Sequence, residues 1–207
     1  MLVRLYTNTI IAPKGGGYSG ASQSHKHIQF IPLENQDGPP IDRLARQAHI
    51  EMPGLTSHSS DTRIYAYYFF PEKPFSLHKL SYVSHSFRFP SYFDTFPSDR
   101  LEMVISDAFL QLLDATISAI RHYPDYPVGS LSYNVIVTLE YMHIIPRQKD
   151  GHVLEETGEK LSVNALGFAG MLLAKSEQEV EAVKRESIGK ILRSVGLENM
   201  YDNQEIE

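Results

Sequence analysis

The sequence predicts an α+β protein with a mainly antiparallel sheet and flanking helices. Several short runs of β-branched and aromatic residues are joined by tight turns, and two longer segments have apolar residues at helical spacing. With 207 residues, of which 42% are apolar, the chain can form an ordinary buried core. We expect two parts, residues 1–90 and residues 91–207, divided within a connection rich in proline.

The first part contains three predicted strands and one helix. Residues 2–11 and residues 25–33 alternate between two faces, and residues 62–70 are rich in β-branched and aromatic side chains, so each of these segments is expected to be a strand. Residues 41–52 are expected to form a short helix. Residues 71–97 combine prolines with many aromatic residues, which predicts an irregular connection that is nevertheless buried.

The second part contains the clearest helices. Apolar residues recur at helical spacing through residues 98–123 and stop at Pro124, which predicts a helix packed against the core. The last helix is expected to begin with a capping box of Ser176 and Glu179 and to end at Gly196.

Four short strands are predicted between these helices. Residues 133–139 and residues 141–145 are separated by a turn, which indicates an antiparallel pair. Residues 161–164 and residues 168–174 are expected to form a second pair around Gly167. These pairs complete the predicted antiparallel sheet.

Charge and composition exclude several functions. The net charge is −6 without a run of basic residues, so neither nucleic acid nor a membrane surface is an expected partner. No segment is expected to approach transmembrane length, and the N-terminus does not look like a signal peptide. There is no cysteine, which excludes disulfides, thiolate metal sites and a cysteine nucleophile. We expect a cytoplasmic location, with the nucleus as an alternative.

The predicted strand at residues 25–33 holds the candidate active-site side chains. His25, His27 and Gln29 alternate along it and should share one face. A neutral imidazole is a good nucleophile toward phosphorus and also a leaving group, so it can divide a phosphoryl or nucleotidyl transfer into two steps. The preceding segment, residues 15–22, is rich in glycine and serine and could bring backbone amides close to an anion.

The spacing of the His-x-His pattern is also compatible with a metal site or with a structural role. Alternate histidines on one strand face can be adjacent metal ligands, although no third ligand stands at an obvious position. Two histidines in ordinary hydrogen bonds are the plainest alternative. The remaining histidines are scattered and expected to be structural or exposed: His49, His58, His78, His85, His122, His143 and His152.

Two separated motifs resemble a known family. The sequence SGASQSHKHIQF at residues 19–30 is similar to the active-site segment of fungal-type diadenosine tetraphosphate phosphorylases, also called ATP adenylyltransferases. Residues 132–138, 142–147 and 161–173 resemble the C-terminal region of that family, and the two motifs occur in the right order. The family is the transferase branch of the histidine triad superfamily, so the resemblance implies a histidine-triad-like sheet with flanking helices.

The resemblance also implies a reaction. The middle histidine of the motif, here His27, would be the nucleophile in phosphorolysis of diadenosine tetraphosphate to ADP and ATP. His25 would orient His27, and Gln29 marks the transferase branch, which also includes galactose-1-phosphate uridylyltransferase. Ser22 and Gln29 would hold phosphate oxygens. The substrate-binding loop implied by the resemblance comprises Ser19, Gly20, Ala21, Ser22 and Gln23.

The resemblance further implies a cofactor and a missing region. A divalent cation, Mg²⁺ or Mn²⁺, is expected, and the partners would be diadenosine polyphosphate, ATP, ADP and inorganic phosphate. Family members carry a substantial N-terminal region ahead of the motif, whereas here the motif begins at Ser19. We therefore expect the chain to lack part of the adenosine pocket, and the alternative function is a catalytically silent nucleotide-binding remnant.

Overall fold

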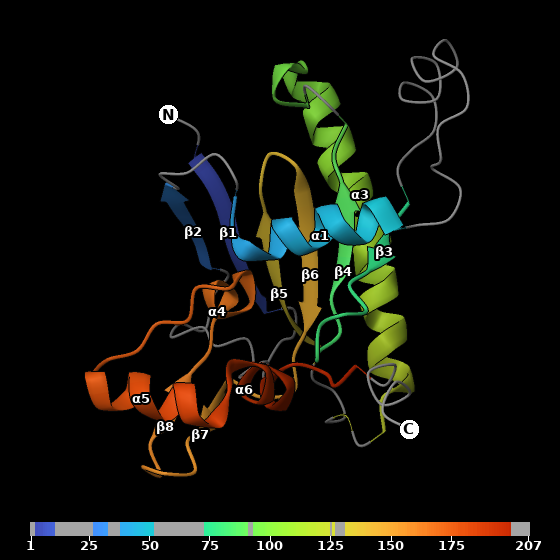
Figure 1. Ribbon diagram of the computed structural model, residues 1–207. Coiled ribbons are helices and arrows are strands. Elements are labelled where there is room, and N and C mark those ends of the chain that lie inside the picture. Colours follow the sequence, from blue (N-terminus) through green and yellow to red (C-terminus); the bar gives the residue numbers. More distant parts are fainter. Residues whose placement is uncertain are drawn as a thin grey trace.

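A six-stranded antiparallel sheet organises the protein (Figure 1). The computed structural model describes residues 3–10, 27–32, 38–51, 73–90, 93–124, 126 and 131–199. The strand order is β2-β1-β5-β6-β4-β3, and every neighbouring pair is antiparallel. The strands are β1 (Val3–Ile10), β2 (His27–Pro32), β3 (Phe75–Ser76), β4 (His85–Arg88), β5 (Ser132–Val137) and β6 (Tyr141–Pro146). The predicted α+β class with an antiparallel sheet is confirmed.

Helices cover both faces of this sheet. The helix α1 (Pro40–Glu51) crosses one face, and α3 (Ser98–His122) lies along the other (Figure 1). Ile136 and Ile145 pack with Ile41 of α1 in one core cluster, whereas Val135 and Ile144 pack with α3 in a second cluster. We call these sides the α1 face and the α3 face. The alternation of β5 and β6 residues between the two clusters follows from the pleat of the strands.

The α3 helix packs through one side only. Ala108, Leu112 and Thr116 are buried at helical spacing, whereas Met103 and Leu110 are exposed. By length and composition alone, α3 could cross a membrane, so the expectation that no segment approaches that length is wrong on this criterion. Its buried side is nevertheless in the core cluster with β4, β5 and β6.

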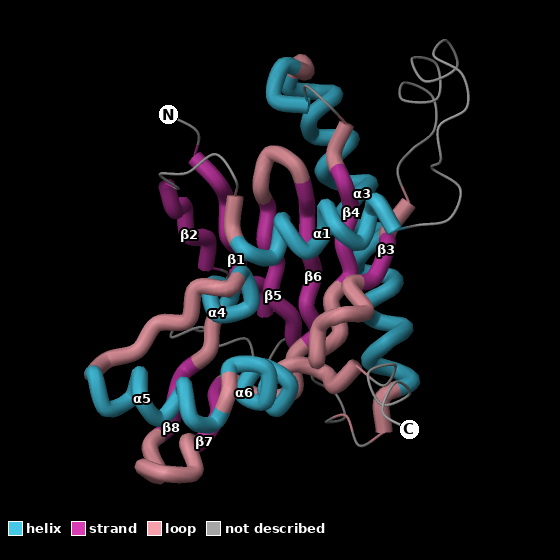
Figure 2. The backbone as a smooth tube through the Cα atoms, in the orientation of Figure 1, coloured by secondary structure: helices cyan, strands magenta, loops and turns pink. Residues whose placement is uncertain are grey.

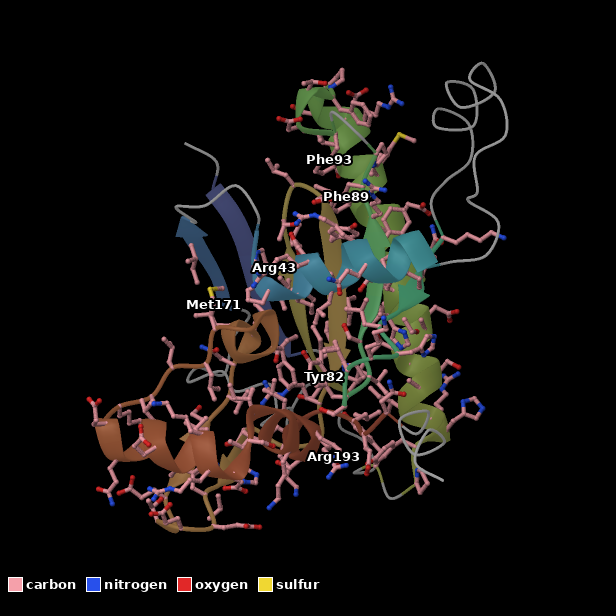
Figure 3. The ribbon with its side chains drawn as sticks, in the orientation of Figure 1. Arg43, Tyr82, Phe89, Phe93, Met171 and Arg193 are labelled. Carbon is pink, nitrogen blue, oxygen red and sulfur yellow. The ribbon has the colours of Figure 1, made fainter. Side chains whose placement is uncertain are left out.

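Aromatic rings extend the α3 face beyond the end of β4. Phe89 follows β4, and Phe93 begins the short 3₁₀ helix η1 (Phe93–Thr95). The two rings stack with centroids 4.3 Å apart, beside the N-terminal half of α3 (Figure 3). Both rings are buried and add aromatic surface to the core of the α3 face.

A smaller layer completes the α1 face. It comprises the hairpin of β7 (Gly151–Val153) and β8 (Lys160–Ser162) and the helices α4 (Ala165–Ala169), α5 (Glu177–Glu186) and α6 (Ile188–Val195). Figure 2 shows the loop that joins α4 to α5. The predicted capping box opens α5, because the Ser176 Oγ accepts a hydrogen bond from the Glu179 backbone N–H at 3.2 Å. The single helix predicted from Ser176 is broken in two at Ser187, which has a φ of 76°.

Two local predictions are wrong. Residues 71–97 were expected to be irregular, yet they contain β3 and β4. Residues 168–174, the second predicted strand around Gly167, are not a strand: Phe168 and Ala169 end the helix α4, and residues 171–174 are irregular. The Asn164 side chain caps the first turn of α4, and Gly170 ends the helix with a φ of 95°. A side chain at position 170 would also collide with Pro40, 2.5 Å from the added Cβ. The strand predicted at residues 62–70 lies outside the described residues.

Candidate functional site

The strand β2 places two of the predicted site residues on one face of the sheet. In its register with β1, His27 pairs with Asn8, and Gln29 pairs with Tyr6. Alternate residues of a strand share a face, so His27 and Gln29 lie on the same side. Ile31 continues this series and packs against the core cluster under α1, which identifies the shared side as the α1 face. The catalytic roles of His27 and Gln29 stay predictions.

The other predicted site residues fall outside the described part of the chain. They are His25 and the loop residues Ser19, Gly20, Ala21, Ser22 and Gln23. The loop precedes β2 in the sequence by a few residues. Its predicted contact with an anion therefore stays a prediction.

A row of polar residues runs across the sheet from His27. Asn8 pairs with His27 on one side and with Asn134 of β5 on the other. Because neighbouring strands lie about 4.8 Å apart, Asn134 is about 10 Å from His27 along this row. Asn134 is fully buried, and its Oδ1 accepts a hydrogen bond from Arg147 Nη1 at 2.5 Å. The row therefore ends at an amide whose orientation is fixed.

Arg147 is a buried cation beside this row. Its Nη2 donates to the Lys149 backbone carbonyl at 2.7 Å, and its guanidinium lies 5.0 Å from the centroid of the Phe168 ring. Burial lowers the pKa of Arg147 to about 9, and the nearby carboxylate of Asp150 opposes this shift. Arg147 is consequently still protonated at neutral pH and supplies positive potential within the α1 face. An arginine directly after an apolar strand was the available sequence signal, and the sequence alone assigned it no role.

A second buried polar group joins α1 to the sheet. Ser86 Oγ lies 2.8 Å from His143 Nδ1, and His143 Nε2 lies 3.1 Å from Asp42 Oδ1. All three residues are fully buried. Serine, histidine and aspartate in this order resemble a hydrolase triad, but a nucleophile must be reachable by substrate. We therefore interpret this group, which we call the Asp42 network, as a structural link between α1 and β6.

The histidines that we expected to be structural or exposed divide into two kinds. His143 belongs to the Asp42 network, and His152 lies 2.6 Å from both Glu186 Oε1 and Ser194 Oγ, which joins β7 to α5 and α6. Those two are structural, as expected. His78, His85 and His122 are not scattered in space, because they line one pocket beside α3.

The expected divalent cation finds no ligand set among the described residues. No group of three histidine, aspartate, glutamate or cysteine side chains there is arranged to hold a metal ion. The His-x-His metal site considered from the sequence includes His25, which lies outside the described residues, so it stays a prediction.

Fold and site together define an α+β protein whose antiparallel sheet carries a His-x-Gln strand beside a buried polar row. Residues 78–198 match the family model of the ATP adenylyltransferase C-terminal domain, which is more than half of the chain. The chain belongs to this family. The matched region includes β4, β5, β6 and α3 but not β2.

Two curated relatives from Saccharomyces cerevisiae extend the similarity to the N-terminal part. Diadenosine 5',5'''-P1,P4-tetraphosphate phosphorylase 2 and Protein APA1 are each 24% identical over 187 residues, which is 89% of this chain and 51% of the relative. The chain thus spans about half the length of the curated relatives it matches.

Solved structures share the fold. The yeast Ap4A phosphorylase Apa2 in complex with AMP has a TM-score of 0.64 and 21% identity, and the match covers 98% of this chain and 59% of that chain. The same enzyme in complex with Ap4A has a TM-score of 0.59 and 20% identity, with coverage of 95% and 55%. At this identity, the comparison establishes the fold and leaves the activity to experiment.

Proposed function

We propose that the chain is a nucleotidyltransferase that phosphorolyses diadenosine tetraphosphate to ADP and ATP through an adenylyl-histidine intermediate. One observation carries this proposal: His27 and Gln29 share the α1 face of β2 in a chain of the ATP adenylyltransferase family. The relatives named as phosphorylases support it, as does the solved relative bound to Ap4A.

In the proposed first step, the neutral imidazole of His27 attacks an α-phosphorus of diadenosine tetraphosphate. A P–N bond forms between His27 and the α-phosphorus, the P–O bond from this phosphorus to the rest of the polyphosphate breaks, and ATP leaves. In the second step an oxygen of inorganic phosphate attacks the adenylyl group, which yields ADP and restores His27. A labile P–N bond makes each step easier than a direct transfer.

The other residues would position groups and stabilise charge. We assign to His25 the orientation of His27, and to Gln29 and Ser22 the binding of non-bridging oxygens, which gain charge in the transition state. Backbone amides of Ser19, Gly20, Ala21 and Gln23 would add donors. The positive potential of buried Arg147, held beside Asn134 in the row of His27, favours a polyphosphate on this face.

A catalytically silent nucleotide-binding remnant is the second candidate. The chain spans only 51% of its curated relatives, so groups that complete the adenosine pocket in those proteins can lie in the half it does not match. Such a protein would share its ancestry with the phosphorylases and would bind nucleotides, but it would not convert them to products.

Product analysis separates the two candidates. The purified chain is incubated with diadenosine tetraphosphate and Mg²⁺ or Mn²⁺, with and without inorganic phosphate, and nucleotides are resolved by chromatography. ADP and ATP that form only with phosphate would establish a phosphorylase, and products without phosphate would indicate a hydrolase. Nucleotide binding without any product, in protein shown to be folded by circular dichroism, would establish the remnant.

A further inference from the structure

The helix α4 lies over the row of strand residues that begins at His27. Asn134 belongs to this row, and the Arg147 guanidinium that donates to its Oδ1 also lies 5.0 Å from the centroid of the Phe168 ring. Phe168 is part of α4, which packs on the α1 face against β1 and β5. Because β1 is the direct neighbour of β2, α4 covers the strand next to that of His27, about 4.8 Å away.

The helix α1 covers the next row on the same face. This row runs from Gln29 through β1 and Ile136 of β5 to His143 of β6. His143 Nε2 lies 3.1 Å from Asp42 Oδ1, which places the first turn of α1 over the row. The rows of His27 and Gln29 are therefore covered by two different helices, α4 and α1.

The two helices meet at Gly170. This glycine ends α4 with a φ of 95°, and a Cβ added to it would lie 2.5 Å from the side chain of Pro40, the first residue of α1. Met171 comes directly after this contact, and its backbone N–H donates to the Leu166 carbonyl at 2.9 Å. The backbone of Met171 is thus held by the end of α4 beside the start of α1.

The side chain of Met171 borders the α1 face of β2. It is half-buried and packs against the same core cluster as Ile31 of β2, which lies on the strand face of His27 and Gln29. Figure 3 shows Met171 between α4 and β2. An apolar side chain therefore stands beside β2 at the junction of the two helices that cover the rows of His27 and Gln29.

The chemistry of this border suits a nucleobase. A methionine thioether is polarizable, makes favourable contacts with aromatic rings and adapts its shape through three rotatable bonds. Residues 171–174 carry no charged side chain, so this part of the loop fits an uncharged ring better than a phosphate. In a nucleotide the ribose separates the phosphate from the base, so a phosphate at His27 leaves the base free to reach the neighbouring wall.

We propose that Met171 contacts the purine base of the nucleotide whose phosphate reaches His27. The nature of the ligand rests on the proposed function, but the contact does not require turnover, because a nucleotide-binding remnant would use the same wall. The loop after α4 is thereby assigned one side of the base subsite.

NMR of methionine methyl groups tests this contact directly. The full chain, which has six methionines, is labelled with ¹³C at these methyl groups and titrated with AMP, and the Met171 resonance is assigned with Met171→Leu. We expect the ring current of the base to move the Met171 resonance. Met103, 71% exposed on α3, is the internal control and should stay in place. Ribose 5-phosphate, which lacks the base, should leave Met171 nearly unmoved.

Two variants separate a base contact from a structural role. Met171→Ala should weaken AMP binding about fivefold through loss of the thioether–ring contact, whereas binding of ribose 5-phosphate should not change. Met171→Leu conserves the apolar volume and should bind AMP within about twofold of the parent chain. Met103→Ala is the matched control and should bind both ligands as the parent does.

The proposal is overturned if the Met171 resonance stays in place up to the highest soluble concentration of AMP, whether or not the chain phosphorolyses diadenosine tetraphosphate. Equal weakening of AMP and ribose 5-phosphate binding in Met171→Ala would also overturn it, since that result would mean a structural role. Movement of Met171 with AMP in a chain without phosphorolysis would support the contact and contradict only the phosphorylase activity. Should Met171→Ala fail to fold, the resonance of the parent chain decides the question.

Discussion

The two faces of the sheet are stabilised in different ways. On the α3 face, the buried cluster that contains Phe87, Val135, Ile144 and Leu112 is apolar, and polar side chains such as His85 line the pocket beside α3. The α1 face combines an apolar cluster with buried hydrogen-bonded groups, the Asp42 network and the Arg147–Asn134 pair. Apolar packing tolerates small shifts, whereas buried hydrogen bonds require defined positions. This difference indicates that the α1 face, which carries His27, is the one held to a fixed geometry.

The largest expected effect concerns the apolar face. Leu112→Ala should lower the free energy of unfolding by about 3 kcal/mol, because it removes a fully buried side chain and leaves a cavity. Urea unfolding measures this change. Leu110→Ala, at a position 62% exposed on the same helix, is the matched control and should change stability by less than about 0.5 kcal/mol. Equal losses in both variants would mean that α3 does not pack through its Leu112 side.

A slightly smaller effect is expected on the polar face. Asp42→Ala leaves buried His143 Nε2 without its partner and should cost about 2 kcal/mol of unfolding free energy. Hydrogen exchange of α1 amides should also accelerate more than that of α3 amides, because the Asp42 network joins α1 to β6. Asp114→Ala, on the exposed side of α3, serves as the control. Unchanged protection of α1 would contradict the structural role of the network.

The third prediction concerns pH and the α3 face. The pKa of His85 falls from 6.5 to about 4 on folding, mainly because burial disfavours the charged ring. Between these values the unfolded chain binds more protons than the folded chain, so stability decreases as the pH falls through this window. We expect a loss of about 2 kcal/mol between pH 6 and pH 4 from this group. His78, His122 and Glu198 line the same pocket as His85.

Unfolding in urea at several pH values measures this dependence. His85→Gln should flatten the profile between pH 6.5 and pH 4, whereas His122→Gln, at an exposed position, should leave it nearly unchanged. If the pH profile of His85→Gln ran parallel to that of the parent chain, a group other than His85 would cause the loss of stability.

Local patterns in the sequence were sufficient for the long elements. The strands β1, β5 and β6 and the helices α1 and α3 were predicted near their observed bounds, because their apolar periodicity spans enough residues. The short strands β3 and β4 were missed, since nearby prolines indicated irregular structure and no local pattern shows that β4 pairs with β6 and β3 with β4. Similarly, the break at Ser187 lies in a sequence that is helical by pattern on both sides.

The candidate site was predictable only in part. The His-x-Gln strand and its shared face follow from alternation within a few residues. Arg147 was missed because its contact with Phe168 joins distant parts of the sequence. The pocket lined by His78, His85 and His122 likewise forms only where β4, α3 and residues 197–199 come together in the fold, and no local sequence pattern predicts this contact.

The central claim, that His27 is a nucleophile toward phosphorus, is tested most directly by intact-protein mass spectrometry. The chain is incubated with diadenosine tetraphosphate and no inorganic phosphate, so that an adenylylated intermediate can accumulate. We predict one added AMP group in the parent chain, less in His25→Asn and none in His27→Asn, with the group lost when phosphate is added. Adenylylation that persists in folded His27→Asn, or that is absent from the folded parent chain, would contradict the claim.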